Sequence, residues 1–166
     1  MSGLHRGVTP YVLLSKKVAD EIRQARHDRL PKETGGFLIG LRRGPHVEIT
    51  DLTHQGTGDY ASRTSFERRD PKHRKKILAS WRASGSTESL VGDWHSHPYG
   101  APEPSATDRK AWKTLAQAVG RPVIGLIEAG LTMPGIFLAV RRGLRFGVRL
   151  EMVEEGHDYF LFAEEH

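Results

Sequence analysis

The sequence predicts an α/β fold in which a mixed β-sheet is flanked by helices. The chain has 166 residues, a length typical of one compact domain. Hydrophobic residues make up 37% of it and charged residues 27%, which leaves enough apolar side chains for a core. Short apolar runs alternate along the chain with segments of helical periodicity, as in proteins that pack helices on a sheet. We therefore expect residues 1–166 to form a single domain.

The first predicted element is an amphipathic helix over residues 12–29. Val18, Ile22 and Ala25 recur there at helical spacing, and Ser15 is a candidate cap. A second helix, with Ile77 among its apolar residues, is predicted over residues 70–83. The remaining elements follow from apolar runs, alternation and turn residues. They are strands at 35–41, 46–53, 64–67 and 90–97, a helix at 105–119, an antiparallel meander of strands at 123–128, 135–140 and 144–153, and a short strand at 160–162.

Composition excludes several classes of protein. The chain has no cysteine, so disulfides, thiolate metal ligands and a cysteine nucleophile are ruled out. Any metal must therefore be held by His, Asp, Glu or water. The sequence contains no apolar run of the ~20 residues that a membrane-spanning helix needs, and residues 1–10 lack the apolar core of a signal peptide. We expect a soluble cytoplasmic protein without a membrane partner.

The net charge of +5 comes from two local basic stretches, at residues 63–76 and 141–149. A basic face can bind nucleic acid or an acidic protein surface. The simpler interpretation is a solvated helix face together with edge strands, and we favour it over nucleic-acid binding.

A metal site is predicted where the strand at 90–97 ends. His95 and His97 lie two residues apart, so both imidazoles point to the same face of the strand. Asp108 follows in the first turn of the next helix, which the proline-rich loop from Pro98 to Pro104 brings back to the strand end. Two histidines and one carboxylate leave a fourth position for water, as in catalytic rather than structural zinc sites. Zinc lowers the pKa of its bound water to ~7.

Two further side chains complete the predicted chemistry. Glu33 stands directly before the apolar strand at 35–41, from which its carboxylate could accept a proton from water and return it to a leaving amine. Ser105 could donate a hydrogen bond to the oxyanion that forms during attack on a carbonyl. Each signal is weak alone. The spacing of Ser105 and Asp108 is also that of a helix capping box, which is compatible with a ligand role for Asp108. Asp93 could orient a ligand histidine, although a surface or turn role is more typical.

These residues carry a resemblance to a known family. Glu33, His95-Ser96-His97-Pro98, Ser105 and Asp108 match the JAMM motif of the MPN-type metalloproteases, E…H-[ST]-H-x7-S-x2-D, and the segment around Glu33 resembles the family's first strand. The resemblance implies a cytidine-deaminase-like MPN domain. It also implies one catalytic Zn²⁺ on the two histidines and the aspartate, Glu33 as the catalytic base and Ser105 as the oxyanion donor.

The resemblance further implies an isopeptidase. Members cleave ubiquitin, ubiquitin-like or sulfur-carrier proteins after the C-terminal glycine, either to release them from a target or to process a precursor. The compact single-domain form resembles the prokaryotic members, some of which stand beside E1-like and E2-like conjugation enzymes in antiviral defence operons. The sequence assigns no oligomeric state.

Three alternatives remain open. The first is hydrolysis of a sulfur-carrier adduct or of small peptides. The second is a RadC-like, DNA-associated protein, because residues 102–108 resemble that branch of the superfamily and the chain is basic. The third is a noncatalytic MPN scaffold, which the intact motif disfavours. An amidohydrolase barrel also uses paired histidines, but about 250 residues is its usual size.

Overall fold

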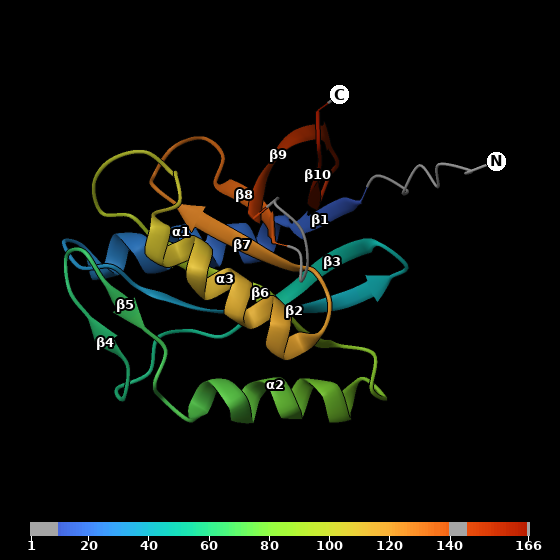
Figure 1. Cartoon of the computed structure of the whole chain (residues 1–166), viewed down its shortest axis with the longest axis horizontal. Helices are drawn as coiled ribbons and strands as arrows, with labels where there is room; N and C mark the ends of the chain where they lie inside the picture. Colours follow the sequence, from blue (N-terminus) through green and yellow to red (C-terminus); the bar gives the residue numbers. More distant parts are fainter. Residues whose placement is uncertain (1–9, 140–145, 166) are drawn as a thin grey trace.

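The computed structural model describes residues 10–139 and 146–165 (Figure 1). Within this part of the chain a mixed β-sheet is packed by three helices, which confirms the predicted fold class. The elements are β1 Tyr11–Ser15, α1 Lys16–Arg29, β2 Gly35–Arg43, β3 His46–Leu52, β4 Tyr60–Ala61, β5 Phe66–Glu67, α2 Lys72–Ala83, β6 Ser89–Ser96, α3 Ala106–Val119, β7 Val123–Glu128, β8 Gly135–Ala139, β9 Phe146–Glu155 and β10 Tyr159–Ala163. None of these helices combines the length and apolar character that a membrane crossing requires.

The large sheet closes on itself in the order β1-β10-β9-β8-β7-β6-β2-β3. Strand β1 completes the closure by pairing in parallel with β3, and β6 pairs in parallel with β7. The other neighbours are antiparallel, including the predicted meander of β7, β8 and β9. Strands β4 and β5 form a separate two-stranded hairpin. The start of β2 therefore lies beside the end of β6. Glu33 of the predicted site shortly precedes β2, and His95 lies in β6.

The N-terminal segment differs from its prediction. Residues 12–15, expected to be helical, form β1, and the helix begins only at Lys16. Val12 and Leu14 are fully buried, and β1 pairs with β10 on one side and β3 on the other. Ser15 occupies the cap position, but its side chain makes no capping hydrogen bond. The strand and the helix follow each other directly, without a turn residue between them. The sequence pattern therefore did not separate the two elements, and both were predicted as one helix.

Helices cover both faces of the central strands. In Figure 1, α3 lies in front of the sheet and α1 behind it. Behind the sheet, α1 contributes to a core that includes Ile22, Trp94 and Leu126. In front of the sheet, Trp112 of α3 packs in a second hydrophobic core. A Cβ atom on Gly125 of β7 would overlap the Trp112 ring, so the glycine lets α3 approach the sheet closely. This close approach brings the start of α3 to the end of β6.

Helix α2 is anchored by a polar group rather than by the expected apolar side. Leu78 and Trp81 are 37% and 44% exposed, whereas His73 of the same helix is buried. Its Nδ1 atom lies 2.6 Å from Thr53 Oγ1 and its Nε2 atom 2.7 Å from Asp59 Oδ2. A histidine on a basic helix gave no sequence signal of burial, because both of its partners lie in a preceding loop region.

The second basic stretch falls mostly outside the described residues. Arg141, Arg142 and Arg145 are not part of the described chain, nor are Val140 and Leu144 of the predicted strands. Within the described part, Arg149 is exposed on β9 and pairs with Glu103 and Glu151.

Asp59 organises the loop between β3 and α2. Its side chain is fully shielded from solvent and accepts hydrogen bonds from the backbone N–H groups of Gly56, Arg69 and Asp70. Burial by itself would raise the pKa of this carboxyl. The bonds from Asp70, Gly56, His73 and Arg69 outweigh that effect, so the pKa lies below its usual value.

Replacing Asp59 by Asn tests this account through pH. A depressed folded-state pKa means that the ionised carboxylate stabilises the fold above the unfolded pKa, and that this stabilisation is lost as pH falls through the folded value. We expect Asp59→Asn to lower the free energy of unfolding most at pH 6 to 7, and progressively less towards pH 3. Urea unfolding of both proteins across that range measures the difference. A difference in the free energy of unfolding that stays constant or grows towards acid pH would contradict the lowered pKa of Asp59.

Candidate metal centre

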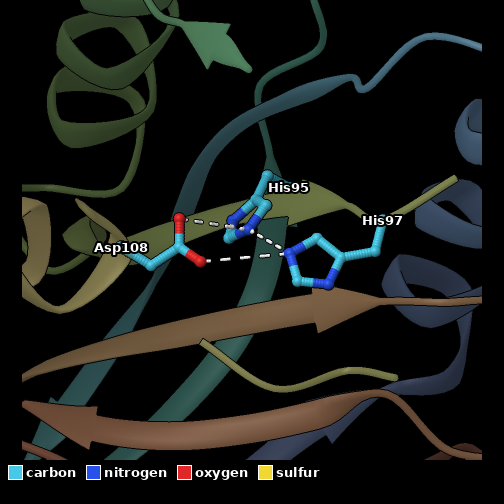
Figure 2. A group of neighbouring side chains, drawn as sticks. All are labelled: His95, His97 and Asp108. Atoms are coloured by element: carbon cyan, nitrogen blue, oxygen red, sulfur yellow. Dashed lines mark hydrogen bonds and ion pairs between the residues drawn. The ribbon is translucent and has the colours of Figure 1, made fainter. Parts of the chain in front are cut away.

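Strand β6 presents the two predicted histidines on one face. His95 lies within the strand and His97 directly after it, and their Nε2 atoms are 3.1 Å apart (Figure 2). His97 Nδ1–H donates to the carbonyl oxygen of Ala101 at 2.9 Å, which leaves the Nε2 lone pair facing His95. The loop that supplies this carbonyl is held in turn by Arg26 of α1. The Arg26 guanidinium donates to the carbonyl oxygens of His97 and Pro98 at 3.0 and 3.1 Å.

Asp108 joins the histidines from the first turn of α3 (Figure 2). The helix begins with a capping box: Ser105 Oγ accepts from Asp108 N–H, and Asp108 Oδ2 accepts from Ser105 N–H at 2.8 Å. Asp108 Oδ1 also lies 3.4 Å from His95 Nε2, and Oδ2 lies 3.9 Å from His97 Nε2. The capping box and the position beside the histidines therefore coexist in one side chain.

The three side chains fit a single divalent ion. Their candidate ligand atoms lie within 4.8 Å of one another. In a tetrahedral site with Zn–N and Zn–O bonds of about 2.0–2.1 Å, neighbouring ligand atoms are about 3.3 Å apart, close to the spacings around His95. Burial would raise the pKa of Asp108, but the hydrogen bond and charge of His95, with two bonds to Ser105, hold that pKa far below its usual value. An ionised carboxylate between two imidazoles is a donor set suited to zinc.

Glu33 lines the same cavity, which has a volume of about 460 Å³ and also contains His95, Asp108 and Ser105 on its walls. Its position directly before β2 is fixed by a backbone hydrogen bond to the carbonyl oxygen of Ser62, at 2.7 Å. Burial raises the pKa of Glu33 above its usual value. The charge of His95 opposes the rise, Asp108 adds to it and Arg68 opposes it. All five predicted residues, Glu33, His95, His97, Ser105 and Asp108, thus border one cavity.

Two cavity residues differ from their sequence interpretation. Asp93, expected at a surface or turn, is buried and accepts a hydrogen bond from Trp112 Nε1 at 2.8 Å rather than contacting a histidine. Arg68 belongs to the stretch that we expected to be solvated, yet only 15% of its side chain is exposed. It reaches into the cavity wall beside Asp93. Neither position has a spacing signal, because the burial of each depends on residues from other elements.

Comparison with known families agrees with this geometry. Residues 15–141 match the model of the prokaryotic homologs of the JAB domain. The chain therefore belongs to the prokaryotic JAB-domain family, which confirms the resemblance.

The individual relatives include proteins named CD-NTase/cGAS isopeptidase. One from Vibrio cholerae is 40% identical over 91 residues, which cover 55% of this chain and 57% of that protein. Another from Escherichia coli is 38% identical over 95 residues, covering 57% and 60%. A probable metalloprotease of Sinorhizobium fredii is 33% identical over 104 residues, covering 59% and 63%. The chain thus aligns with less than two thirds of each of these relatives.

A solved structure shares the fold. The solution structure of protein DSY2949 from Desulfitobacterium hafniense superposes with a TM-score of 0.60 at 26% sequence identity. The match covers 80% of this chain and 87% of that protein.

Removing one histidine tests the metal centre. We expect His95→Ala to purify with little bound zinc, because the His95 imidazole lies close to both of the other proposed ligands, His97 and Asp108. Elemental analysis of wild type and variant, each dialysed against zinc and then buffer, measures the loss. His27→Ala is the matched control, since the side chain of His27 is 79% exposed on α1. Equal zinc content in all three proteins would exclude the assigned site.

Proposed function

We propose that this protein is a zinc-dependent isopeptidase that cleaves the bond formed by the C-terminal glycine of a conjugated protein. The observation that carries the proposal is the meeting of His95, His97 and Asp108 at one point, with Glu33 on the same cavity wall. Membership of the prokaryotic JAB-domain family supports the reaction class, and relatives with isopeptidase names support the type of bond.

His95, His97 and Asp108 would hold the metal ion. A bound divalent ion would polarise the scissile carbonyl and make water more acidic. Glu33 accepts a proton from the attacking water as the water oxygen bonds to the carbonyl carbon, and its raised pKa makes the carboxylate a stronger base for this step. Ser105, whose Oγ accepts from Asp108 N–H, keeps its own hydroxyl hydrogen to donate to the developing oxyanion. Glu33 then delivers the proton to the leaving nitrogen and the C–N bond breaks, which gives a carboxylic acid and an amine. Proton transfer between these products leaves a carboxylate and an ammonium group.

The surroundings of the cavity suit an extended substrate chain. An apolar groove of about 480 Å³ shares Arg68, Asp93, Thr107 and Ala111 with the wall of the catalytic cavity. A flexible C-terminal tail lying in this groove would place its last carbonyl in the cavity. Glycine at that end meets the least steric resistance, because it has no side chain.

The names of several relatives point to a CD-NTase/cGAS protein as one member of the conjugate. A ubiquitin-like modifier attached by E1-like and E2-like enzymes in an antiviral defence system is the related candidate.

Cleavage of defined substrates tests the proposal. The panel is a CD-NTase fused through its C-terminal glycine to a second protein, a ubiquitin-like protein fused in the same way, and a short peptide amide. We expect zinc-dependent release of the protein fusions, stopped by a chelator and restored by zinc. Cleavage of the peptide alone would instead favour a small-peptide hydrolase. Salt-dependent DNA binding without cleavage would favour the RadC-like alternative.

Glu33→Gln separates the proton acceptor from the metal site. The amide keeps the size of the side chain but cannot accept the proton, so we expect kcat/KM to fall by about 10²- to 10⁴-fold. Zinc content and thermal unfolding should match wild type, because the glutamate is not among the metal-binding residues. Full hydrolysis by the variant would remove Glu33 from the reaction.

A further inference from the structure

Arg68 spans the junction between β2 and β6 beside the candidate metal centre. Its Nε–H donates to the carbonyl oxygen of Gly36 at 2.6 Å, and an Nη2–H donates to the carbonyl oxygen of Trp94. The first carbonyl belongs to β2 and the second to β6, so one planar guanidinium joins the two strands. Such a fork fixes direction as well as distance, because its N–H groups have a rigid geometry.

The carbonyls that Arg68 holds are close in sequence to two functional side chains. Gly36 pairs with Trp94 and Gly35 with His95 in the antiparallel register. The Trp94 carbonyl belongs to the peptide bond that leads into His95, and Gly36 follows Glu33 by three residues. The fork therefore bridges the strands one residue away from a predicted metal ligand.

The guanidinium is itself fixed on several sides. It lies over the rings of Phe37 and Phe66, with its central carbon 5.5 and 5.4 Å from their centroids. An Nη1 atom lies 3.7 Å from Asp93 Oδ2. Behind it, Asp59 holds the N–H groups of the next two residues, Arg69 and Asp70. These contacts leave the side chain little freedom, as expected of a group that sets the position of others.

We propose that Arg68 is a positioning residue, which holds the ends of β2 and β6 in the register that places Glu33 and His95 around the metal ion. The proposal rests on the metal site of the proposed function and adds a residue outside the motif. Arg68 acts through backbone carbonyls and takes no part in bond making.

Charge and geometry predict opposite effects on metal affinity. A cation close to a divalent ion repels it, so a purely electrostatic Arg68 would weaken binding, and its removal would tighten binding. A positioning Arg68 improves binding by ordering the ligands, and its removal weakens it. An Arg68→Lys variant further distinguishes the electrostatic role from the positioning role, since lysine keeps the charge but cannot reproduce the planar fork.

The experiment is zinc titration of Arg68→Ala, Arg68→Lys and wild type against a competing chelator, at a temperature where circular dichroism shows each protein fully folded. We expect the Kd for zinc to rise about 10- to 100-fold in Arg68→Ala, as is typical when a group that orients ligands is lost. Arg68→Lys should recover only a small part of the zinc affinity that Arg68→Ala loses. The absorption bands of the Co²⁺-loaded proteins should shift in the same two variants, because they report ligand geometry.

Arg69→Ala is the matched control. This neighbouring arginine is 60% exposed and its side chain pairs with Glu67 at the surface, so its removal should leave the zinc affinity and the Co²⁺ spectrum unchanged. Tighter zinc binding by Arg68→Ala, or full recovery by lysine, would show that charge dominates and would overturn the proposal. A lower unfolding temperature with unchanged affinity would reduce Arg68 to a general stabilising role and overturn it as well.

Amide hydrogen exchange in the metal-free proteins separates this proposal from the proposed function. We expect Arg68→Ala to speed exchange at the β2–β6 pairing around Gly35 and His95, and not at the β7–β8 pairing. If wild type binds no zinc, the proposed function fails, while the exchange rates still decide whether Arg68 holds the strands. Unchanged exchange at both pairings would refute the positioning role even in a protein that binds zinc and cleaves conjugates.

Discussion

The antiparallel pairing of β2 with β6 is the constraint on which the candidate site depends. Gly35 lies opposite His95, and a Cβ atom at Gly35 would come within 2.6 Å of the Trp94 carbonyl oxygen. At Gly36, a Cβ atom would overlap the carbonyl of Thr53. The two strands and the following loop can approach this closely only because both residues lack side chains. Glu33 lies on the same cavity wall as the histidines as a result, although 62 positions separate it from His95 in the numbering of the chain.

Packing on both faces of the sheet keeps that contact rigid. Trp94 points into the core behind β6, while Trp112 covers the front and donates its N–H to Asp93. The buried carboxylate of Asp93 thereby has a hydrogen-bond donor, and it also pairs with Arg68. The cavity is consequently lined by charged groups whose directions are set by the core, a condition that electrostatic catalysis requires.

Much of the fold and the grouping of the predicted residues followed from local patterns. Strand β7 was predicted at its observed bounds, because its apolar run is bracketed by Pro122 and the turn that follows Glu128. The spacing of His95, His97, Ser105 and Asp108 was informative because neighbouring elements carry all four. The buried roles of His73, Asp93 and Arg68 were missed for the opposite reason. Each of these polar residues is buried by partners that arrive from separate loops and helices, and single-sequence patterns carry no record of such long-range pairing.

The capping box at the start of α3 has a consequence for how a metal ion would bind at the candidate centre. Because Ser105 N–H donates to the carboxylate of Asp108, forming the helix also orients this predicted ligand, and the entropy of ordering its side chain is lost during folding rather than on metal binding. The carboxylate would thus be oriented before a metal ion binds, unlike the ligands of small zinc domains that fold only around their ion. A metal ion held by the proposed site would then exchange reversibly on a folded scaffold, and the concentration of free metal would set the fraction of metal-loaded molecules without any of them unfolding.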